Sequence, residues 1–238
     1  MPRATTTERS RPMKRTRNGI LIPDVPIMAG GNLPNAVKGV SGSSDVNWRK
    51  TGAYIESISR FAQIDTLLTM REYRAELDIA FLSNITNQHF IGHIVEDNRT
   101  FVRQSPTNAL HLDMNIGLSE VAGYDIALNT RYLLEIKFFD NDVELYINGE
   151  TPIQHNGTPT EGPIYLFNAY ITRDVNHRLG SLIKIWSVKI WDKEGELIRE
   201  MYPAYVDNEV GMYDYVSNIY YFDSGTKEGG IGFKYGVS

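Results

Sequence analysis

Apolar and polar residues alternate in the run YRAELDIAF at residues 73–81, and this alternation restricts the possible fold more than any other feature. The apolar members are Tyr73, Ala75, Leu77, Ile79 and Phe81. All of them fall on one side of an extended strand, because successive side chains point to opposite faces. No long window shows a sustained helical period, and residues 119–128 are the one short helical candidate. The chain is therefore predicted to be built from half-buried strands.

Further β-rich runs are separated by short turn signals. Residues 132–139 and 143–149 flank a short Asp-Asn-Asp segment, which predicts a hairpin, and Asn-Gly-Glu at 148–150 predicts the next turn. Strands are also expected at 162–170 and 182–191, and a turn at 192–196 leads into another strand. For 182–191 the expected faces are Ile183, Ile185, Ser187 and Lys189 on one side, and Leu182, Lys184, Trp186, Val188 and Ile190 on the other. Short strands at this spacing indicate an antiparallel sandwich or barrel.

The composition supports a folded β-domain and excludes several kinds of site. The chain has 238 residues, of which 42% are hydrophobic and none is cysteine. It can therefore bury a core, but it has no disulfide, no thiolate metal site and no cysteine nucleophile. No apolar run reaches the roughly 20 residues that a membrane helix needs, so no membrane contact is expected. The basic start is not followed by the uninterrupted apolar segment of a secretory signal.

Charge divides the chain into a basic arm, residues 1–49, and an acidic body, residues 50–238. Residues 1–17 carry six Arg or Lys and one Glu, a net of +5. Residues 50–238 carry sixteen Arg or Lys and 26 Asp or Glu, a net of −10. Prolines and glycines in the arm disfavour a helix or a central strand, yet the arm is apolar between Ile20 and Leu33. We expect it to be extended and to need a surface on which to lie.

Two interpretations of the arm remain open. It is either a solvated, mobile terminus or a segment that docks on an acidic protein partner within an oligomeric assembly. The docking residues would be Arg15, Arg17, Ile20, Ile22, Val25 and Ile27. Nucleic acid is not the expected partner, because the arm has no aromatic residue before Trp48 on which a base could stack.

Six segments then follow in a recognisable order: YIESISRFAQIDT (54–66), AELDIAF (75–81), HFIGH (89–93), VELYINGE (143–150), PIYLFNAY (163–170) and the long run at 182–226. In this order they resemble the concanavalin A-like, or laminin G-like, jelly-roll domains of tailed-bacteriophage and bacterial surface proteins. The resemblance covers about residues 52–230 and not the arm. It departs from the family in lacking glycines after Ser57 and in ending with GGIGFKYGVS. It implies an all-β fold, an antiparallel jelly-roll β-sandwich preceded by an extended N-terminal arm.

The run at 182–226 is the most specific part of the resemblance, and its residues are expected to close the sandwich. These residues are Arg199, Pro203, Gly211, Tyr213, Asp214, Tyr221 and Gly225. Tyr213 and Tyr221 would bury their rings between the sheets and direct their hydroxyls to backbone groups. Asp214 would hold its own turn through Asx-type bonds. Gly211 and Gly225 would supply backbone angles that a side chain penalises.

The sequence offers no complete catalytic or metal-binding set. Family-16-type glycosidases share this sandwich and carry Glu-x-Asp-x-x-Glu on one strand. Here Glu76 and Asp78 match, but Phe81 replaces the third carboxylate, so we predict no enzyme activity. His89 and His93 would lie roughly 13 Å apart on a strand, too far to share one ion. The segment 140–142 has oxygen ligands that calcium could use, but it fits a hairpin turn. We predict no cofactor and no metal.

Two functions are compatible with these features. The first is a non-enzymatic structural protein of a virion, synthesised in the host cytoplasm. It would be a capsid decoration, head-fibre or connector-type subunit whose arm contacts other virion proteins while a lectin-like domain projects outward. The second is a carbohydrate-binding module or lectin for surface glycans, which would use polar loop side chains. Those side chains would be Asn168, Asp174, Asn176 and Arg178, with the loop at 96–100 as a further candidate.

Overall fold

Strands form the regular structure of the computed structural model, which describes residues 37–39, 52–83, 88–95, 98–104, 109–114, 118–119, 126–140, 142–150, 152–155, 157–169, 180–206, 209–225 and 232–238. These residues contain no α-helix, and hence no helix that is long and apolar enough to cross a membrane. All the strands belong to one unit, Leu33–Ser238. Of the helical candidate at 119–128, Ser119 ends a strand and residues 126–128 are not helical, whereas 120–125 lie outside the described residues.

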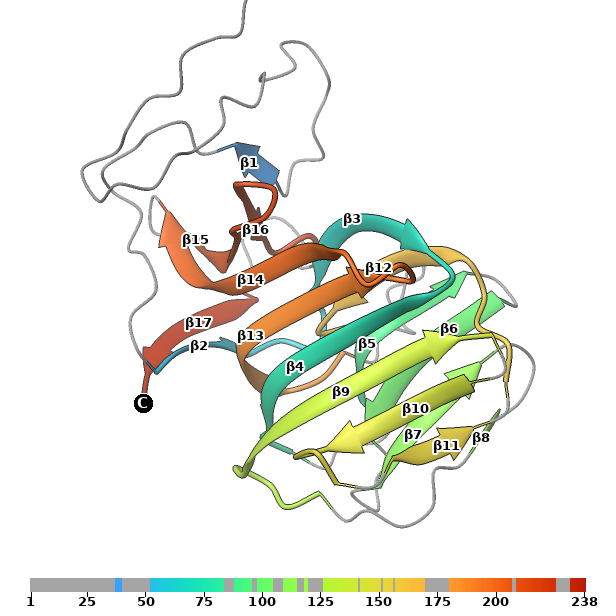
Figure 1. Ribbon diagram of the computed structural model, residues 1–238. Helices are drawn as coiled ribbons and strands as arrows, with labels where there is room; N and C mark the ends of the chain where they lie inside the picture. The colour runs from blue at the N-terminus through green and yellow to red at the C-terminus, as the bar shows by residue number, and fades with distance from the viewer. Residues whose placement is uncertain are drawn as a thin grey trace, which may run out of the picture. The chain divides into compact units, whose positions relative to one another are not determined.

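A large antiparallel sheet forms one layer of this unit (Figure 1). Its strands, in spatial order, are β1 (Val37–Gly39), β16 (Ile219–Phe222), β15 (Glu209–Asp214), β14 (Leu197–Val206), β13 (Ile183–Asp192), β4 (Tyr73–Phe81), β9 (Arg131–Phe139), β10 (Asp142–Ile147) and β11 (Ile153–His155). Two further strands, β2 (Ala53–Ser57) and β17 (Phe233–Val237), join it because β2 pairs with both β13 and β17.

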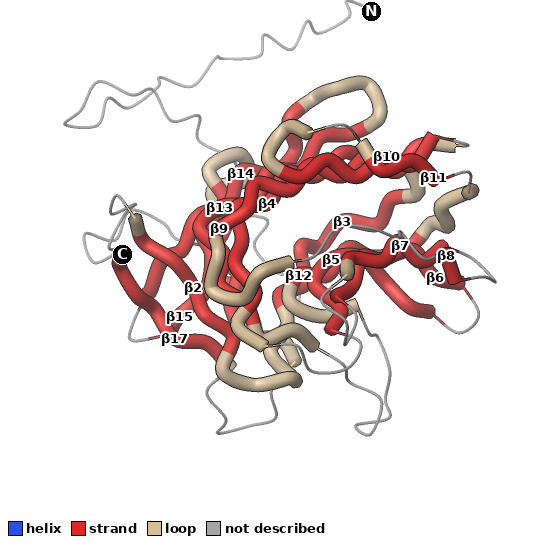
Figure 2. The backbone as a smooth tube through the Cα atoms, turned by 90° about the horizontal axis from the view of Figure 1, so that it is seen from below, coloured by secondary structure: helices blue, strands red, loops and turns tan. Residues whose placement is uncertain are grey.

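A smaller antiparallel sheet forms the second layer (Figure 2). Its strands, in spatial order, are β3 (Ile64–Met70), β12 (Gly162–Leu166), β5 (Gln88–Val95), β6 (Asn98–Gln104), β7 (Leu110–Met114) and β8 (Leu118–Ser119). Every pair of strands in either sheet is antiparallel. The predicted all-β antiparallel sandwich is therefore confirmed.

The core lies between the two layers and follows the predicted alternation. The five apolar residues of β4, from Tyr73 to Phe81, are fully buried. They pack in one cluster with small-sheet residues such as Phe90, Val102 and Leu112. Phe81 and Phe90 meet edge to face with their ring centres 5.3 Å apart, which joins the layers directly.

The predicted hairpin is also present. β9 and β10 pair from Phe139↔Asp142 to Leu134↔Ile147. The turn after β10 has positive φ at both Asn148 (53°) and Gly149 (74°), which suits an Asn-Gly pair. The Asn148 side chain accepts a hydrogen bond from the Leu133 amide at 2.9 Å, so the turn is tied to the neighbouring strand.

The faces predicted for residues 182–191 are correct through Trp186 and wrong from Ser187 onward. In the pairing with β4, Ile185 lies opposite Ile79 but Ser187 lies opposite Asp78, so Trp186 is an extra residue. Such a β-bulge reverses the side to which the following residues point. Ile183 and Ile185 are buried before the bulge, and Val188 and Ile190 are buried after it. Trp186, Ser187 and Lys189 are consequently all on the outer face.

The last strands close the sandwich around a buried carboxylate, Asp214. Its Oδ1 accepts hydrogen bonds from the amides of Glu200 (2.8 Å) and Val216 (3.1 Å), and its Oδ2 accepts one from the Ser217 amide (3.2 Å). The Val216 bond is the Asx-type contact expected from the sequence. Arg199 lies 3.5 Å from Asp214 and donates to the Thr66 carbonyl in β3 at 3.1 Å, so this residue links the two sheets.

The two closing tyrosines occupy different places. The Tyr221 ring is fully buried in the main core, as expected, but its hydroxyl does not form the expected hydrogen bond to a backbone group of the described residues. Tyr213 instead belongs to a second small cluster with Ala204 and Tyr220, and its hydroxyl donates to the Asn218 side chain at 3.1 Å rather than to a backbone group. The expectation that both rings lie between the sheets therefore holds for Tyr221 only.

Close packing, not backbone angle, explains the two closing glycines, which corrects the expectation from the sequence. Neither has a positive φ. A Cβ atom at Gly211 would lie 2.1 Å from the Tyr221 carbonyl oxygen, and one at Gly225 would lie 2.0 Å from that of Phe61. Pro203 lies two residues after Met201, which is the last residue of β14 that pairs with β13. The backbone N–H that proline lacks therefore removes no hydrogen bond to β13.

Candidate functional site

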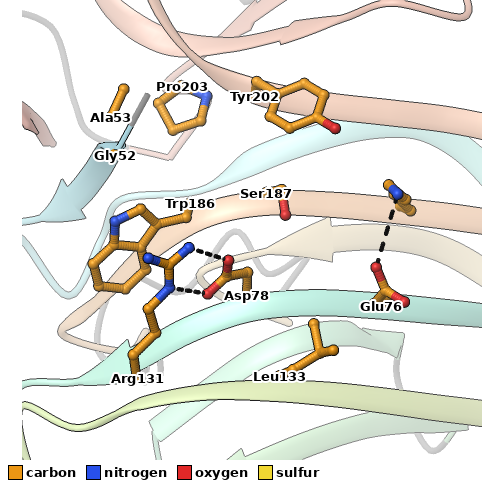
Figure 3. Close-up of a pocket in the computed structure, with 11 residues that line it drawn as sticks. Gly52, Ala53, Glu76, Asp78, Arg131, Leu133, Trp186, Ser187, Tyr202 and Pro203 are labelled. Carbon is orange, nitrogen blue, oxygen red and sulfur yellow. Dashed lines mark hydrogen bonds and ion pairs between the residues drawn. The ribbon is translucent and has the colours of Figure 1, made fainter. Parts of the chain in front are cut away.

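A hollow of about 480 Å³ lies on the outer face of the large sheet, the face turned away from the small sheet (Figure 3). We call it the outer hollow. It is lined by Gly52 and Ala53, by Glu76 and Asp78 of β4, by Arg131 and Leu133 of β9, by Trp186, Ser187 and Lys189 of β13, and by Tyr202 and Pro203 of β14. Four strands from distant parts of the chain thus contribute polar side chains to one surface.

Strand alternation and register place these side chains. Because the odd-numbered residues of β4 face the core, Glu76 and Asp78 face outward, as predicted. Residues paired across antiparallel strands point to the same side. The register therefore puts Lys189 beside Glu76, and Leu133 beside Asp78. The bulge in β13 adds Trp186 next to Ser187 on the same side.

Arg131 is held from two sides. Its Nε donates to Asp78 Oδ1 at 2.6 Å, and its Nη2 donates to Asp78 Oδ2. Its guanidinium carbon lies 4.5 Å from the centre of the Trp186 ring, within cation–π range. Figure 3 shows the guanidinium between the indole and the carboxylate. The hydrogen bonds to Asp78 raise the pKa of Arg131, so it stays charged.

The Trp186 indole acts as a support for this arginine. The ring of Tyr54 lies 5.5 Å from it, and the indole Nε1 donates to Ser238 Oγ at 3.3 Å. With Arg131 against the ring and a hydrogen bond at its edge, the indole has little freedom to turn. The orientation of the guanidinium is therefore fixed before any ligand arrives.

Lys189 provides a second cation at the other end of the outer hollow. Its Nζ lies 4.0 Å from a carboxylate oxygen of Glu76 and 4.0 Å from one of Glu200. The Tyr202 hydroxyl donates to Glu200 at 2.9 Å, which fixes this carboxylate. Both cations of the outer hollow are thus accompanied by acidic groups.

The outer hollow combines the groups needed to bind a polyhydroxylated molecule. Arg131 and Lys189 are hydrogen-bond donors, Asp78 and Glu76 are acceptors, and Ser187 can do both. Leu133, which is 45% exposed, provides apolar surface beside them. A few fixed polar groups around apolar surface are typical of a small-molecule binding site.

The glycosidase pattern is incomplete in space as well as in sequence. Glu76 and Asp78 line the outer hollow, but Phe81 is buried in the core on the other face of β4. Glu76 is accompanied by Lys189, and Asp78 is bonded to Arg131. Within the described residues, no group of three or more His, Asp or Glu side chains is arranged to hold a metal ion.

The predicted carbohydrate-binding loop is placed only in part. Asn168 is fully buried, where its side-chain oxygen accepts a hydrogen bond from the Ala169 amide at 2.8 Å. In this position it supports the backbone of its loop. Asp174, Asn176, Arg178 and the six docking residues of the arm lie outside the described residues. Their roles stay predictions. Of the candidate loop at 96–100, residues 96–97 also lie outside them, whereas residues 98–100 belong to strand β6 and are not a loop.

The two histidines considered as metal ligands are buried in β5. The His89 ring meets Phe101 edge to face at 4.5 Å. His93 Nε2 lies 3.0 Å from Thr160 Oγ1, and Gly162 packs so closely that a Cβ there would be 2.4 Å from the ring. Burial lowers the pKa of His93 to about 4, so the ring is neutral near pH 7.

Acidification should destabilise the protein through His93. In the unfolded chain, His93 binds a proton when the pH falls below its ordinary pKa near 6.5. In the folded chain it does so only when the pH falls to about 4. Stability contributed by the neutral ring is therefore lost as pH falls through this window, by up to about 3 kcal/mol. Urea unfolding at several pH values measures this loss. In His93→Gln, the free energy of unfolding should depend clearly less on pH between about 4 and 6.5. An unchanged pH dependence would contradict the role assigned to His93.

Comparisons with known proteins agree on the fold. No protein-family model matches the sequence, and no curated protein matches it significantly. A solved structure of a candidate carbohydrate-binding protein from Bacteroides ovatus ATCC 8483 superposes with a TM-score of 0.58 at 11% identity. The match covers 79% of this chain and 60% of that one. This chain therefore spans less than two thirds of that protein.

Two further matches are a SAP-like pentraxin from Limulus polyphemus and domains LG4-5 of the mouse laminin α1 chain. The pentraxin gives a TM-score of 0.45 at 12% identity, over 59% of this chain and 76% of that one. The laminin domains give 0.45 at 13% identity, over 62% and 43%. The order of the two antiparallel sheets and the superposition on the Bacteroides ovatus structure confirm the concanavalin A-like jelly-roll fold that the sequence resemblance implied.

The outer hollow is not apparent from the sequence. The sequence marks Glu76 and Asp78 only as possible catalytic groups or as part of a solvated polar face. Their partners Arg131 and Lys189 lie about 50 and 110 residues further along the chain, and only the register of β4 with β9 and β13 brings them together. The useful signal would have been the pairing of polar positions across predicted neighbouring strands.

Proposed function

We propose that this protein is a non-catalytic carbohydrate-binding domain that holds its ligand in the outer hollow. The observation that carries the proposal is the fixed Arg131–Asp78 pair, supported by Trp186 and open to solvent beside Leu133. The side chains of Arg131 and Asp78 are 53% and 19% exposed, so both are accessible to a ligand. The fold shared with a candidate carbohydrate binder is consistent with this function.

The chemistry of the outer hollow suits a sugar. Hydroxyl groups both donate and accept hydrogen bonds, and they can satisfy a carboxylate and a guanidinium at once. The C–H face of a pyranose ring can lie on apolar surface of the kind that the exposed Leu133 side chain provides. Because Arg131 and Trp186 are already ordered, binding costs less side-chain entropy than at a flexible surface.

Replacing Arg131 tests the proposal. A glycan array with the full chain identifies ligands, and isothermal titration measures the affinity for the strongest one. Arg131→Ala should weaken binding by about 2 kcal/mol, roughly thirtyfold, since it removes a charged donor and leaves Asp78 unpaired. The matched control is Arg71→Ala, because Arg71 also forms an exposed ion pair, with Asp140, but lies outside the outer hollow.

The control variant should bind like the parent. Equal affinity of Arg131→Ala and the parent, or an array without any glycan signal, would refute the proposal. Hydrolysis is not part of it, because Glu76 and Asp78 are ion-paired and the third carboxylate is absent. Release of reducing ends from a bound glycan would contradict this point.

The virion role predicted from the arm is a separate matter. It depends on residues 1–49, of which the structure describes only 37–39, paired through β1 with β16. The partners, the localisation and the boundary at residue 49 therefore stay predictions. A glycan-binding domain and a virion arm are compatible in one chain.

A further inference from the structure

We propose that the outer hollow selects neutral glycans and discriminates against sugars that carry a carboxylate, because each of its cations is already neutralised by an acidic side chain. This inference rests on the proposed function and specifies its ligand class. Two cations, Arg131 and Lys189, and two carboxylates, Glu76 and Asp78, line the outer hollow, so its formal charge is balanced.

The pairing of Arg131 leaves nothing for a second carboxylate to neutralise. Asp78 takes the guanidinium through two parallel hydrogen bonds, the geometry in which an arginine would otherwise bind an acidic sugar. Trp186 and Asp78 together fix the guanidinium, so it does not turn toward an incoming anion at low cost. An acidic sugar would have to displace Asp78 or bind beside it.

The second cation is still less available to an anion. Lys189 lies at 4.0 Å from both Glu76 and Glu200, so two carboxylates share one ammonium group. A third carboxylate at this place would face two negative charges within a partly enclosed hollow, where such repulsion is weakly screened. The net charge of −5 of the whole chain adds repulsion at longer range.

A neutral sugar, in contrast, can use both members of the Arg131–Asp78 pair. The guanidinium has five N–H donors, and two of them bond to Asp78. Each Asp78 oxygen accepts one of these bonds and keeps acceptor capacity. Two adjacent hydroxyls of a pyranose can therefore donate to the carboxylate and accept from the guanidinium. The geometry suits a vicinal diol.

Asp78→Asn tests the inference, since it keeps the size of the side chain and removes its charge. The probes are pairs of oligosaccharides that differ only in a C6 carboxylate: galactose and galacturonate, mannose and mannuronate, and glucose and glucuronate oligomers. Titration should show that the parent binds the neutral member of at least one pair at least about tenfold more tightly than the acidic member. In Asp78→Asn this preference should shrink by about tenfold or reverse, because Arg131 is then an unpaired cation.

Salt dependence provides a second readout. Binding of the uronate to Asp78→Asn should weaken as salt is added, whereas binding of the neutral sugar to the parent should not change. The control is Asp140→Asn, which removes the carboxylate of the Arg71 ion pair outside the outer hollow and should leave the preference unchanged.

The outcomes separate this inference from the proposed function. Binding of a uronate by the parent as tightly as its neutral counterpart, or an unchanged preference in Asp78→Asn, would overturn the inference while carbohydrate binding itself stands. Absence of binding to every probe and to the glycan array would overturn both.

Discussion

Replacing Asp214 with alanine should lower the free energy of unfolding by about 3–5 kcal/mol, measured by urea denaturation of the full chain. The carboxylate is fully buried and accepts three backbone amide hydrogen bonds, from Glu200, Val216 and Ser217. Without it these amides lose their acceptor, and the mostly buried Arg199 guanidinium loses its counter-charge. Each of these losses is costly because the groups are shielded from water.

A partly exposed turn carboxylate, that of Asp192, provides the control for Asp214. Asp192 accepts a hydrogen bond from the Glu196 amide at 2.8 Å in the turn between β13 and β14. Asp192→Ala should cost only about 1 kcal/mol, because water can replace the lost bond. If Asp214→Ala unfolded at the same urea concentration as Asp192→Ala, the structural role assigned to Asp214 would be wrong.

Tyr213→Ala should be the second strongly destabilising change, again by about 3–5 kcal/mol. The ring is only 5% exposed, clusters with Ala204 and Tyr220, and meets Tyr215 edge to face at 5.2 Å. Truncation would leave a cavity that strands β14 to β16 cannot easily fill. Burial raises the pKa of Tyr213 to about 12, so the phenol stays protonated and donates to Asn218.

Two variants separate the contribution of the Tyr213 ring to stability from that of its hydroxyl and from that of the neighbouring Tyr215 ring. Tyr213→Phe should cost only about 1 kcal/mol, because it keeps the ring and removes one hydrogen bond. Tyr215→Ala should cost less than Tyr213→Ala, since Tyr215 is 39% exposed. If Tyr213→Ala unfolded at nearly the same urea concentration as the parent, the Tyr213 ring would have to be accessible to water.

The sequence was sufficient to predict the fold where local pattern and burial agree. The alternation in β4 and the turn at Asn148 and Gly149 each follow from local chemistry, and the structure contains both. The faces of β13 could not be predicted, because the extra residue Trp186 reverses the face of the sheet to which the later residues of the strand point. No local property of Ile-Trp-Ser distinguishes a bulge from a regular strand.

The candidate site was harder to predict for a related reason. The sequence showed Glu76 and Asp78 as outward-facing carboxylates, but their function depends on Arg131 and Lys189, which only strand register brings near. The places where two backbone segments pack closely could not be predicted from the sequence either. The need for glycine at 211 and 225 comes from carbonyl oxygens of Tyr221 and Phe61, and in the second case these residues are far apart in sequence.

Arg199 couples local unfolding of strand β3, at the edge of the small sheet, to local unfolding of the turn between β15 and β16 in the large sheet. Its guanidinium bonds to the Thr66 carbonyl at the edge of the small sheet and lies beside the carboxylate that organises the final turn. If either β3 or the β15–β16 turn separates locally, this cation loses one acceptor while still largely shielded from solvent. Fraying at the two places is thus cooperative, and the chain behaves there as one unfolding unit rather than two.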